Sequence, residues 1–198
     1  MCPRSEKQFA AMRRKSKRAI RNGSLKLFAR KGFSRTTMED IARQVGISKG
    51  LIYNYFTGKE EVLESLIDEF VERIMPAPLP QAAGADPAKH LERLIRVWFH
   101  EVRRNPDLIR IGVQFHSDFT LRKIVRRKQA EIERTYAGHL EEVFRRLGSP
   151  DPAMETLLLG AVLDGISLNY VAAPEKFPID KIEQHLIRQY CTPRGKLS

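Results

Sequence analysis

The residues best suited to recognising another molecule lie close together in the first third of the chain. Lys49, Gly50, Tyr53 and Asn54 fall within six positions, and on a helix they share the outer side of its first turns. A lysine ammonium donates to guanine acceptors or to phosphate, and an asparagine amide reads a base edge or bonds to the DNA backbone. Glycine allows close backbone approach, and tyrosine offers a hydroxyl to phosphate and a ring to a thymine methyl. This set is suited to the major groove of duplex DNA.

Two short helices joined by a turn are expected to position these side chains. Thr36 and Glu39 have the spacing of a capping box, which predicts a helix start, and Gly46 predicts its end. Ser48 can cap a second helix that carries the four residues above. Two short helices around a turn of about three residues that contains glycine are typical of a helix-turn-helix motif. The amino-terminal end of its second helix enters the major groove.

A second capping box, Thr57 and Glu60, predicts the start of the next helix. Its free amides and Lys59 lie together at a helix start, which favours another phosphate contact. The alternative is that these residues only build a three-helix core. The full set of predicted DNA contacts is Thr36, Thr37, Ser48, Lys49, Gly50, Tyr53, Asn54, Tyr55 and Lys59.

The positive charge of the chain is concentrated around this motif. The 198 residues carry a net charge of +11. Residues 1–62 contain fifteen Lys and Arg against five Asp and Glu, a net charge of +10, and residues 63–198 contain twenty against nineteen, a net charge of +1. Such asymmetry indicates an anionic partner for the first part, although a basic tail that only aids solubility is the alternative. We expect a DNA-binding domain at 1–62 and a second domain at 63–198.

The rest of the chain also has helical periodicity, with no sustained period-2 alternation. The sequence therefore predicts an all-α fold of about nine helices. One of these is a long amphipathic helix that begins at Thr120 and ends at Gly148, and another is the unusually apolar segment 152–172.

The segment GFSRTTMEDIARQVGISKGLIYNYFTGKEEVLESL resembles the amino-terminal domain of the TetR family of bacterial transcriptional regulators. The matching elements cover roughly residues 15–65 and are Gly32-Phe33, Thr36-Thr37, Ile41-Ala42, Gly46, Ser48-Lys49-Gly50, Tyr53, Tyr55-Phe56 and Lys59-Glu60 with Leu63. Gly23 departs from the usual alanine of the first helix, and Asn54 departs from the commoner histidine or aromatic residue.

This resemblance implies roles for individual residues. Thr37, Tyr53 and Lys59 match phosphate-contacting positions, and Lys49, Gly50 and Asn54 match the base-facing turn of the recognition helix. It further implies a homodimer, usually a repressor, on a pseudo-palindromic operator. An unidentified small-molecule effector in the carboxy-terminal domain would release the DNA.

Two groups of apolar residues in the second domain are candidates for the interfaces that such a protein needs. A stripe along residues 152–172 and a second one near the carboxy terminus can pair two copies, although an intramolecular core is the alternative. The dimer candidates are Leu157, Leu158, Ala161, Gly165, Leu168, Ile182, Leu186 and Tyr190. The aromatic candidates for an effector pocket are Trp98, Phe99, Phe115, Phe119, Tyr136 and Tyr170. For each of them, a place in the hydrophobic core is the alternative.

Other functional classes have little support in the sequence. There is no nucleophile elbow, glycine-rich phosphate loop or His-x-x-x-His pair, so we expect neither an enzyme nor a cofactor nor a metal site. A non-specific architectural DNA-binding protein is the main alternative, and the nearly neutral second domain argues against it. Because no apolar stretch approaches the length of a membrane helix and no secretory signal follows the basic amino terminus, we expect a cytoplasmic protein.

Overall fold

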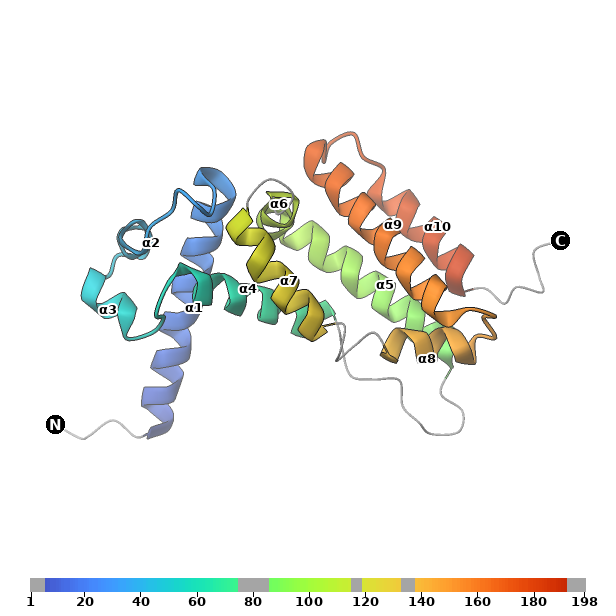
Figure 1. Ribbon diagram of the computed structural model, residues 1–198, viewed down its shortest axis with the longest axis horizontal. Helices are drawn as coiled ribbons and strands as arrows, with labels where there is room; N and C mark the ends of the chain where they lie inside the picture. The colour runs from blue at the N-terminus through green and yellow to red at the C-terminus, as the bar shows by residue number, and fades with distance from the viewer. Residues whose placement is uncertain (1–5, 75–85, 115–118, 133–137, 192–198) are drawn as a thin grey trace. The chain divides into compact units, whose positions relative to one another are not determined.

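The computed structural model describes residues 6–74, 86–114, 119–132 and 138–191, and in this part the chain is helical without any strand. The predicted all-α fold is therefore confirmed. The helices in this part (Figure 1) are α1 (Glu6–Lys31), α2 (Met38–Val45), α3 (Lys49–Tyr53), α4 (Lys59–Ile74), α5 (Pro87–Arg104), α6 (Pro106–Gln114), α7 (Phe119–Ile132), α8 (Gly138–Arg146), α9 (Pro152–Ala172) and α10 (Ile179–Cys191). The described residues form ten helices, against the predicted number of about nine, and the predicted long helix from Thr120 to Gly148 corresponds to α7 and α8 with residues outside the described part between them.

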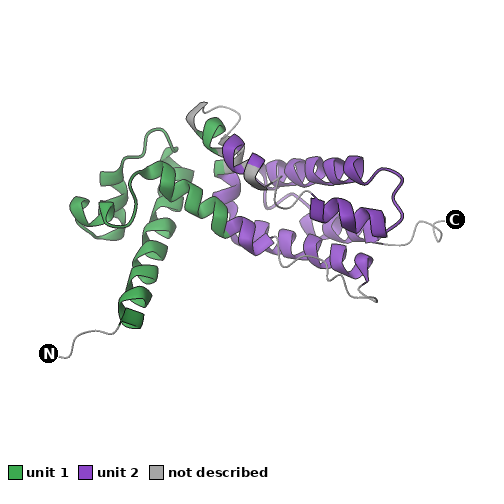
Figure 2. Ribbon diagram, turned by 60° about the horizontal axis from the view of Figure 1, so that its bottom comes forward, with its two compact units in different colours: residues 1–69, 111–125 green, residues 70–110, 126–198 purple. Residues whose placement is uncertain are grey.

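The chain divides into two compact units (Figure 2). Unit 1 comprises residues 1–69 and 111–125, and unit 2 comprises residues 70–110 and 126–198. Unit 1 contains the basic segment and the helix-turn-helix motif, and unit 2 contains α5, α8, α9 and α10.

The core of unit 1 joins α1 to the two short helices that follow it. Phe28 of α1 and Phe33 after it are fully buried, with ring centroids 5.1 Å apart. Ile41 of α2 and Ile52 of α3 are also fully buried. Each short helix therefore contributes one fully enclosed isoleucine to a core that α1 organises. A five-residue helix such as α3 is not stable alone, so this packing holds it in place.

Gly23 lies where α1 and α2 cross closely. A Cβ atom built on Gly23 would stand 2.4 Å from Cγ1 of Val45, well inside van der Waals contact. Glycine inside a helix costs about 1 kcal/mol relative to alanine, and here that cost permits the close crossing. The departure from alanine at this position therefore has a packing reason.

We expect Gly23→Ala to destabilise the protein by about 1–3 kcal/mol, because valine in a helix has one strongly preferred rotamer and cannot easily move aside. In a Val45→Ala background the same change is expected to stabilise by up to about 1 kcal/mol, through helix propensity. Urea unfolding of the wild type, both single variants and the double variant measures this. An equal effect of Gly23→Ala in the two backgrounds would contradict the close crossing.

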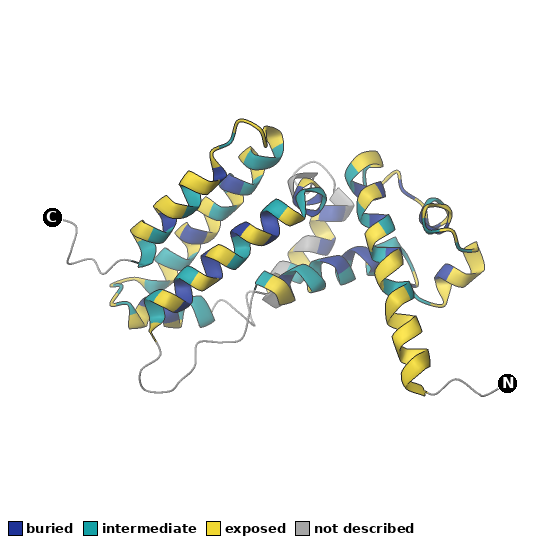
Figure 3. Cartoon of the chain, turned by 180° about the vertical axis from the view of Figure 1, so that it is seen from behind, coloured by how far each residue is buried: buried dark blue, intermediate teal, exposed yellow. Residues whose placement is uncertain are grey.

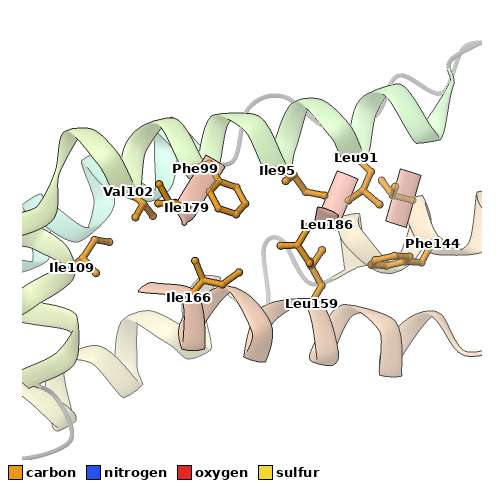
Figure 4. Close-up of a cluster of buried hydrophobic side chains, with 11 residues drawn as sticks. Leu91, Ile95, Phe99, Val102, Ile109, Phe144, Leu159, Ile166, Ile179 and Leu186 are labelled. Carbon is orange, nitrogen blue, oxygen red and sulfur yellow. The ribbon is translucent and has the colours of Figure 1, made fainter. Parts of the chain in front are cut away.

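The apolar core of unit 2 is formed by α5 and α6 together with α8, α9 and α10 (Figure 4). Its members come from two stretches of the sequence, 91–109 and 143–186. They are Leu91, Ile95, Phe99, Val102, Ile109, Val143, Phe144, Leu159, Ile166, Ile179 and Leu186.

An ion-pair network joins α5 to α10 at the edge of this core. The Arg103 guanidinium lies 2.6 Å from a carboxylate oxygen of Asp180 and 2.5 Å from one of Glu183. Arg96 also approaches Glu183, at 3.7 Å. These pairs fix the register of α10 along α5, because both Arg96 and Arg103 meet an acid on the facing helix.

Two histidines join α5 to α8 within unit 2. Nε2 of His90 lies 3.0 Å from Nε2 of His139, and Nδ1 of His90 lies 2.8 Å from a guanidinium nitrogen of Arg93. Arginine has only donors, so Nδ1 of His90 must accept. Its proton is then on Nε2, which donates to His139. Both rings are therefore neutral in the folded protein, and a proton added to either one breaks a hydrogen bond.

We expect the protein to lose stability as the pH falls below about 6.5. Burial, with the nearby Arg93 and His139, lowers the pKa of His90, and burial lowers the pKa of His139. Between pH 6.5 and the lowered pKa values of the folded state, the unfolded chain then binds more protons than the folded one. The free energy of unfolding therefore decreases as the pH decreases through that window. Urea unfolding at pH 7 and pH 5 tests this. His139→Gln, which can still accept from His90, should show a smaller difference, and exposed His185→Gln should match the wild type.

Candidate nucleic-acid interface

Helix α2 begins at a capping box built on Thr37. The Thr37 side chain accepts from the amide of Asp40 at 3.1 Å, and the Asp40 carboxylate accepts from the amide of Thr37 at 3.0 Å. Lys31 also bonds to this carboxylate at 2.5 Å. The hydrogen bonds from Lys31 and Thr37 lower the pKa of Asp40 to about 2. The cap therefore stays charged at all physiological pH values.

The predicted capping box of Thr36 and Glu39 is wrong by one residue. Thr36 is fully buried, and its hydroxyl donates to the carbonyl of Gly32 at 2.8 Å. Thr36 therefore closes the turn after α1, and its side chain is not exposed for the DNA contact that the sequence predicted.

The turn between α2 and α3 has the geometry that the sequence predicts. Gly46 takes the left-handed conformation, with φ 72° and ψ 34°, and the amide of Ile47 donates to the carbonyl of Ala42 at 3.0 Å. The Ser48 side chain then caps α3 by accepting from the amide of Leu51 at 3.2 Å. This turn sets the direction in which α3 leaves α2.

The outer side of α3 carries the residues predicted to meet DNA. Lys49, Gly50, Tyr53 and Asn54 are all exposed, and nothing lies within 4 Å of a Cβ built on Gly50. Tyr53 is 48% exposed although it is a large aromatic residue. Leu51, which the sequence analysis did not single out, is 40% exposed on the same short helix. The structure therefore leaves a cationic side chain, an amide and two large side chains of this short helix open to solvent.

The first helix supports the carboxy-terminal end of α3. Arg13 donates to the carbonyl of Asn54 at 3.1 Å, and its guanidinium lies 5.5 Å from the ring centre of Tyr55. The ammonium of Lys17 lies 5.1 Å from the ring centre of Phe56. Tyr55, a predicted DNA contact, is half-buried beneath Arg13. The sequence did contain a signal for this support, because Arg13 and Lys17 continue the α1 stripe that includes Ile20.

Lys59, another predicted phosphate contact, is bonded within unit 1. Its ammonium donates to the carbonyls of Phe33, Ser34 and Thr36 at 3.0, 3.1 and 3.0 Å. It also lies 4.7 Å from the ring centre of Phe33. All three ammonium hydrogens are therefore used to hold the turn between α1 and α2 against the start of α4.

We expect Lys59→Met, which keeps the apolar stem, to destabilise the protein by about 1–3 kcal/mol, because three carbonyls lose a charged donor. The control is Lys26→Met, on the exposed side of α1, which should change the free energy of unfolding by less than about 0.5 kcal/mol. Urea unfolding gives both values. Equal stability of the two variants would show that the Lys59 contacts contribute nothing.

The start of α4 also differs from the prediction. Glu61, not Glu60, bonds to Thr57: its carboxylate accepts from the Thr57 amide at 2.7 Å and from the hydroxyl at 2.8 Å. These two hydrogen bonds lower the pKa of Glu61. The Thr57 hydroxyl thus donates to a carboxylate instead of accepting from an amide of the helix.

The predicted pocket aromatics have different positions in unit 2. Phe99 is fully buried in the core and packs edge-on against half-buried Trp98, with ring centroids 5.0 Å apart. Tyr170 is half-buried against Phe177. Phe99 is thus a core residue. Phe115 and Tyr136 lie outside the described residues, and the side chain of Phe119 is also not described.

The predicted dimer residues differ in exposure between the two helices that carry them, α9 and α10. On α9, three of the predicted apolar side chains are exposed: Leu157 is 65%, Leu158 48% and Leu168 47% exposed. Ala161 is exposed and Gly165 is half-buried. Met154 and Val162, which the prediction omitted, extend the same face.

On α10 the predicted stripe faces the core of unit 2. Leu186 is buried in that core, and Ile182 and Tyr190 pack against it. Leu186 is therefore a core residue of unit 2, and its part in a dimer interface stays a prediction. Burial also raises the pKa of the Cys191 thiol to about 12, which leaves no appreciable thiolate at neutral pH.

Among the residues that the structure describes, no helix combines the length and the apolar character that crossing a membrane requires. Nor do three or more His, Cys, Asp or Glu side chains come together there as metal ligands would.

Two family models match separate segments of the chain. Residues 20–66 match the model described as bacterial regulatory proteins of the tetR family. Residues 87–191 match the model described as the carboxy-terminal part of a BetI-type transcriptional repressor.

Individual relatives and solved structures agree with these models. The regulator BetI 1 of Chromohalobacter salexigens is 28% identical over 156 residues, 77% of each chain, and BetI of Rhizobium meliloti is 28% identical over 153 residues, 76% of this chain and 75% of its own. The structure of the fatty acid degradation regulator FadR from Bacillus halodurans has a TM-score of 0.70 at 20% identity and covers 90% of this chain and 96% of its own. At that identity it shows a common fold alone. The chain belongs to the TetR family of bacterial regulatory proteins, with a BetI-type carboxy-terminal region, and is a helix-turn-helix transcriptional regulator and not an enzyme.

Proposed function

We propose that this regulator is a homodimeric repressor that binds a pseudo-palindromic operator and leaves it when a small molecule binds the carboxy-terminal domain. The functional division is residues 1–62 for DNA and residues 63–198 for dimerisation and effector binding. The observation that carries the proposal is the open surface of α3, capped by Ser48 and set within a segment of net charge +10. Such a protein acts on the bacterial chromosome, in the cytoplasm.

In this proposal α3 enters the major groove and reads bases. Lys49 and Asn54 contact base edges or phosphates, Gly50 permits close approach, and Tyr53 contacts a phosphate or a thymine methyl. Thr37 and Ser48 lie at the starts of α2 and α3, where exposed hydroxyls and amides favour phosphate. Tyr55 and Lys59 act as positioning residues, because Arg13 covers the first and three carbonyls hold the second.

The exposed face of α9 is the proposed dimer interface. Met154, Leu157, Leu158, Val162 and Leu168 recur at the spacing of one helical face and are all more than a third exposed. Ala161 and Gly165 on the same face are small and allow a close approach of two helices. A two-fold dimer places its two reading helices on half-sites about 34–36 Å apart, which one helix-turn-helix motif alone cannot span.

The effector is proposed from the character of the second domain and of similar proteins. NalD of Pseudomonas aeruginosa, described as a repressor of a multidrug efflux pump, has a TM-score of 0.69 and 24% identity over 89% of this chain and 96% of its own. FadR is described as a regulator of fatty acid degradation. We infer that an organic molecule is the effector here, with half-buried Trp98 and Tyr170 as candidate contacts.

Selection from a pool of random duplexes tests the proposal. The purified full chain should enrich one sequence with two inverted halves whose centres are about one helical turn apart. A footprint on that duplex should cover both halves. Recovery of the pool without enrichment would contradict sequence-specific recognition and favour a non-specific architectural protein.

A further inference from the structure

The first half of α1 carries an unusual concentration of positive charge. Residues 6–18 include six Lys and Arg against one acidic residue, Glu6. Every residue from 6 to 15 is exposed (Figure 3). This part of the helix therefore buries no side chain in the core of unit 1.

One side of this segment is already used within unit 1. Arg13 and Lys17 lie on the stripe of α1 that continues into buried Ile20 and Ser24, and they contact the segment that follows α3. This contact fixes the segment next to the recognition helix.

A second side carries three more cations in a line. Lys7, Arg14 and Arg18 are spaced by seven and four residues, so they lie within about 40° of one another around a helix of 3.6 residues per turn. We call these three residues the basic stripe. They are separated along the axis by up to about 16 Å, at 1.5 Å per residue. All three are exposed, and none forms an ion pair with a described residue.

We infer that the basic stripe binds phosphates of the DNA strand beside the base pairs that α3 reads. This inference rests on the proposed function, and it adds a second contact surface to it. The stripe is continuous with the reading surface, because Arg14 directly follows Arg13, whose guanidinium bonds to Asn54 at the end of α3. A row of uncompensated cations favours a polyanion, since each phosphate contact releases a counterion.

The contact does not depend on base sequence. Phosphate contacts fix the register and orientation of a protein on the duplex, whereas base edges carry the sequence information. The basic stripe therefore raises the affinity for any DNA long enough to reach it. It leaves the ratio between specific and non-specific affinity almost unchanged.

The test compares two triple variants of the full chain with equal net charge. The stripe variant is Lys7→Gln/Arg14→Gln/Arg18→Gln. The control variant changes three exposed positions of unit 2 and is Lys89→Gln/Arg104→Gln/Lys176→Gln. Fluorescence anisotropy gives the dissociation constant between 50 and 300 mM salt, on the selected duplex and on a shuffled duplex of equal length.

The stripe variant is expected to have a less steep dependence of log K on log salt. The decrease is about 2.7 for each bound protomer if all three side chains meet phosphates, at about 0.9 per contact. It should appear on both duplexes, and the control variant should match the wild type. Equal salt slopes for the stripe and control variants would overturn the inference.

A shortened duplex separates this inference from the proposed function. Removing base pairs outside the selected site should weaken DNA binding by the wild type but not by the stripe variant. Failure of the selection experiment contradicts the proposed function, whereas the salt slope on the shuffled duplex still tests the stripe. Specific binding that persists with unchanged slope in the stripe variant supports the proposed function and overturns the stripe.

Discussion

Replacing Tyr53 with alanine is expected to weaken binding to the selected operator by at least about 100-fold and to leave the fold intact. The side chain is 48% exposed on the outer side of α3, so its removal creates no cavity. It offers both a ring and a hydroxyl to DNA, and losing both contacts in each of two half-sites multiplies the effect. Anisotropy with operator and shuffled duplexes measures the loss, and thermal unfolding checks the fold.

Two companion variants make the Tyr53 result interpretable. Tyr53→Phe keeps the ring and removes the hydroxyl, so it should recover the part of the affinity that comes from contact with a thymine methyl. Lys26→Ala, on the exposed side of α1, should bind like the wild type. Unchanged operator affinity in Tyr53→Ala would show that α3 does not read the DNA.

Placing two charges on the outer face of α9 is expected to separate the dimer. In the variant Leu157→Asp/Leu158→Asp, two side chains that are 65% and 48% exposed become carboxylates, which cannot be buried against a second copy without a large desolvation cost. Light scattering should report a particle of 22.8 kDa, the mass of one chain, in place of twice that mass. Because one chain covers only a half-site, operator affinity should fall by about three orders of magnitude or more.

The control for the dimer experiment is Lys89→Asp, which places a carboxylate at an exposed position of α5. It should remain dimeric and bind the operator. Circular dichroism should show the helical content of the wild type in both variants, because the substituted α9 residues are not core residues of unit 2. A double aspartate variant that stays dimeric would move the interface to another face.

The sequence predicted the helix-turn-helix motif well because its signals are local. Gly46 and Ser48 each act through atoms within a few residues, so their types and spacing are sufficient. Local signals could not decide which threonine caps the start of α2. Thr36 with Glu39 and Thr37 with Asp40 have the same spacing, and only the burial of Thr36 against Gly32 selects the second pair.

Contacts between segments that are distant in the chain could not be predicted from the sequence. The three carbonyls that hold Lys59 come from residues at least 23 positions away, and none of their side chains marks the contact. In the same way, periodicity identified apolar stripes on α9 and α10 but not the partner of each. Leu186 of α10 lies in the core of unit 2 while Leu157 of α9 lies outside it, a difference that depends on how each helix packs within unit 2.

The central claim is that this chain distinguishes one DNA sequence from others through α3. The most direct measurement is the ratio of dissociation constants for the selected duplex and a shuffled duplex of equal length, both at 150 mM salt. We expect a ratio of about 10³ or more for the wild type and a ratio at least about 100-fold lower for Tyr53→Ala. A wild-type ratio below about three would contradict it, whatever the affinity for DNA in general.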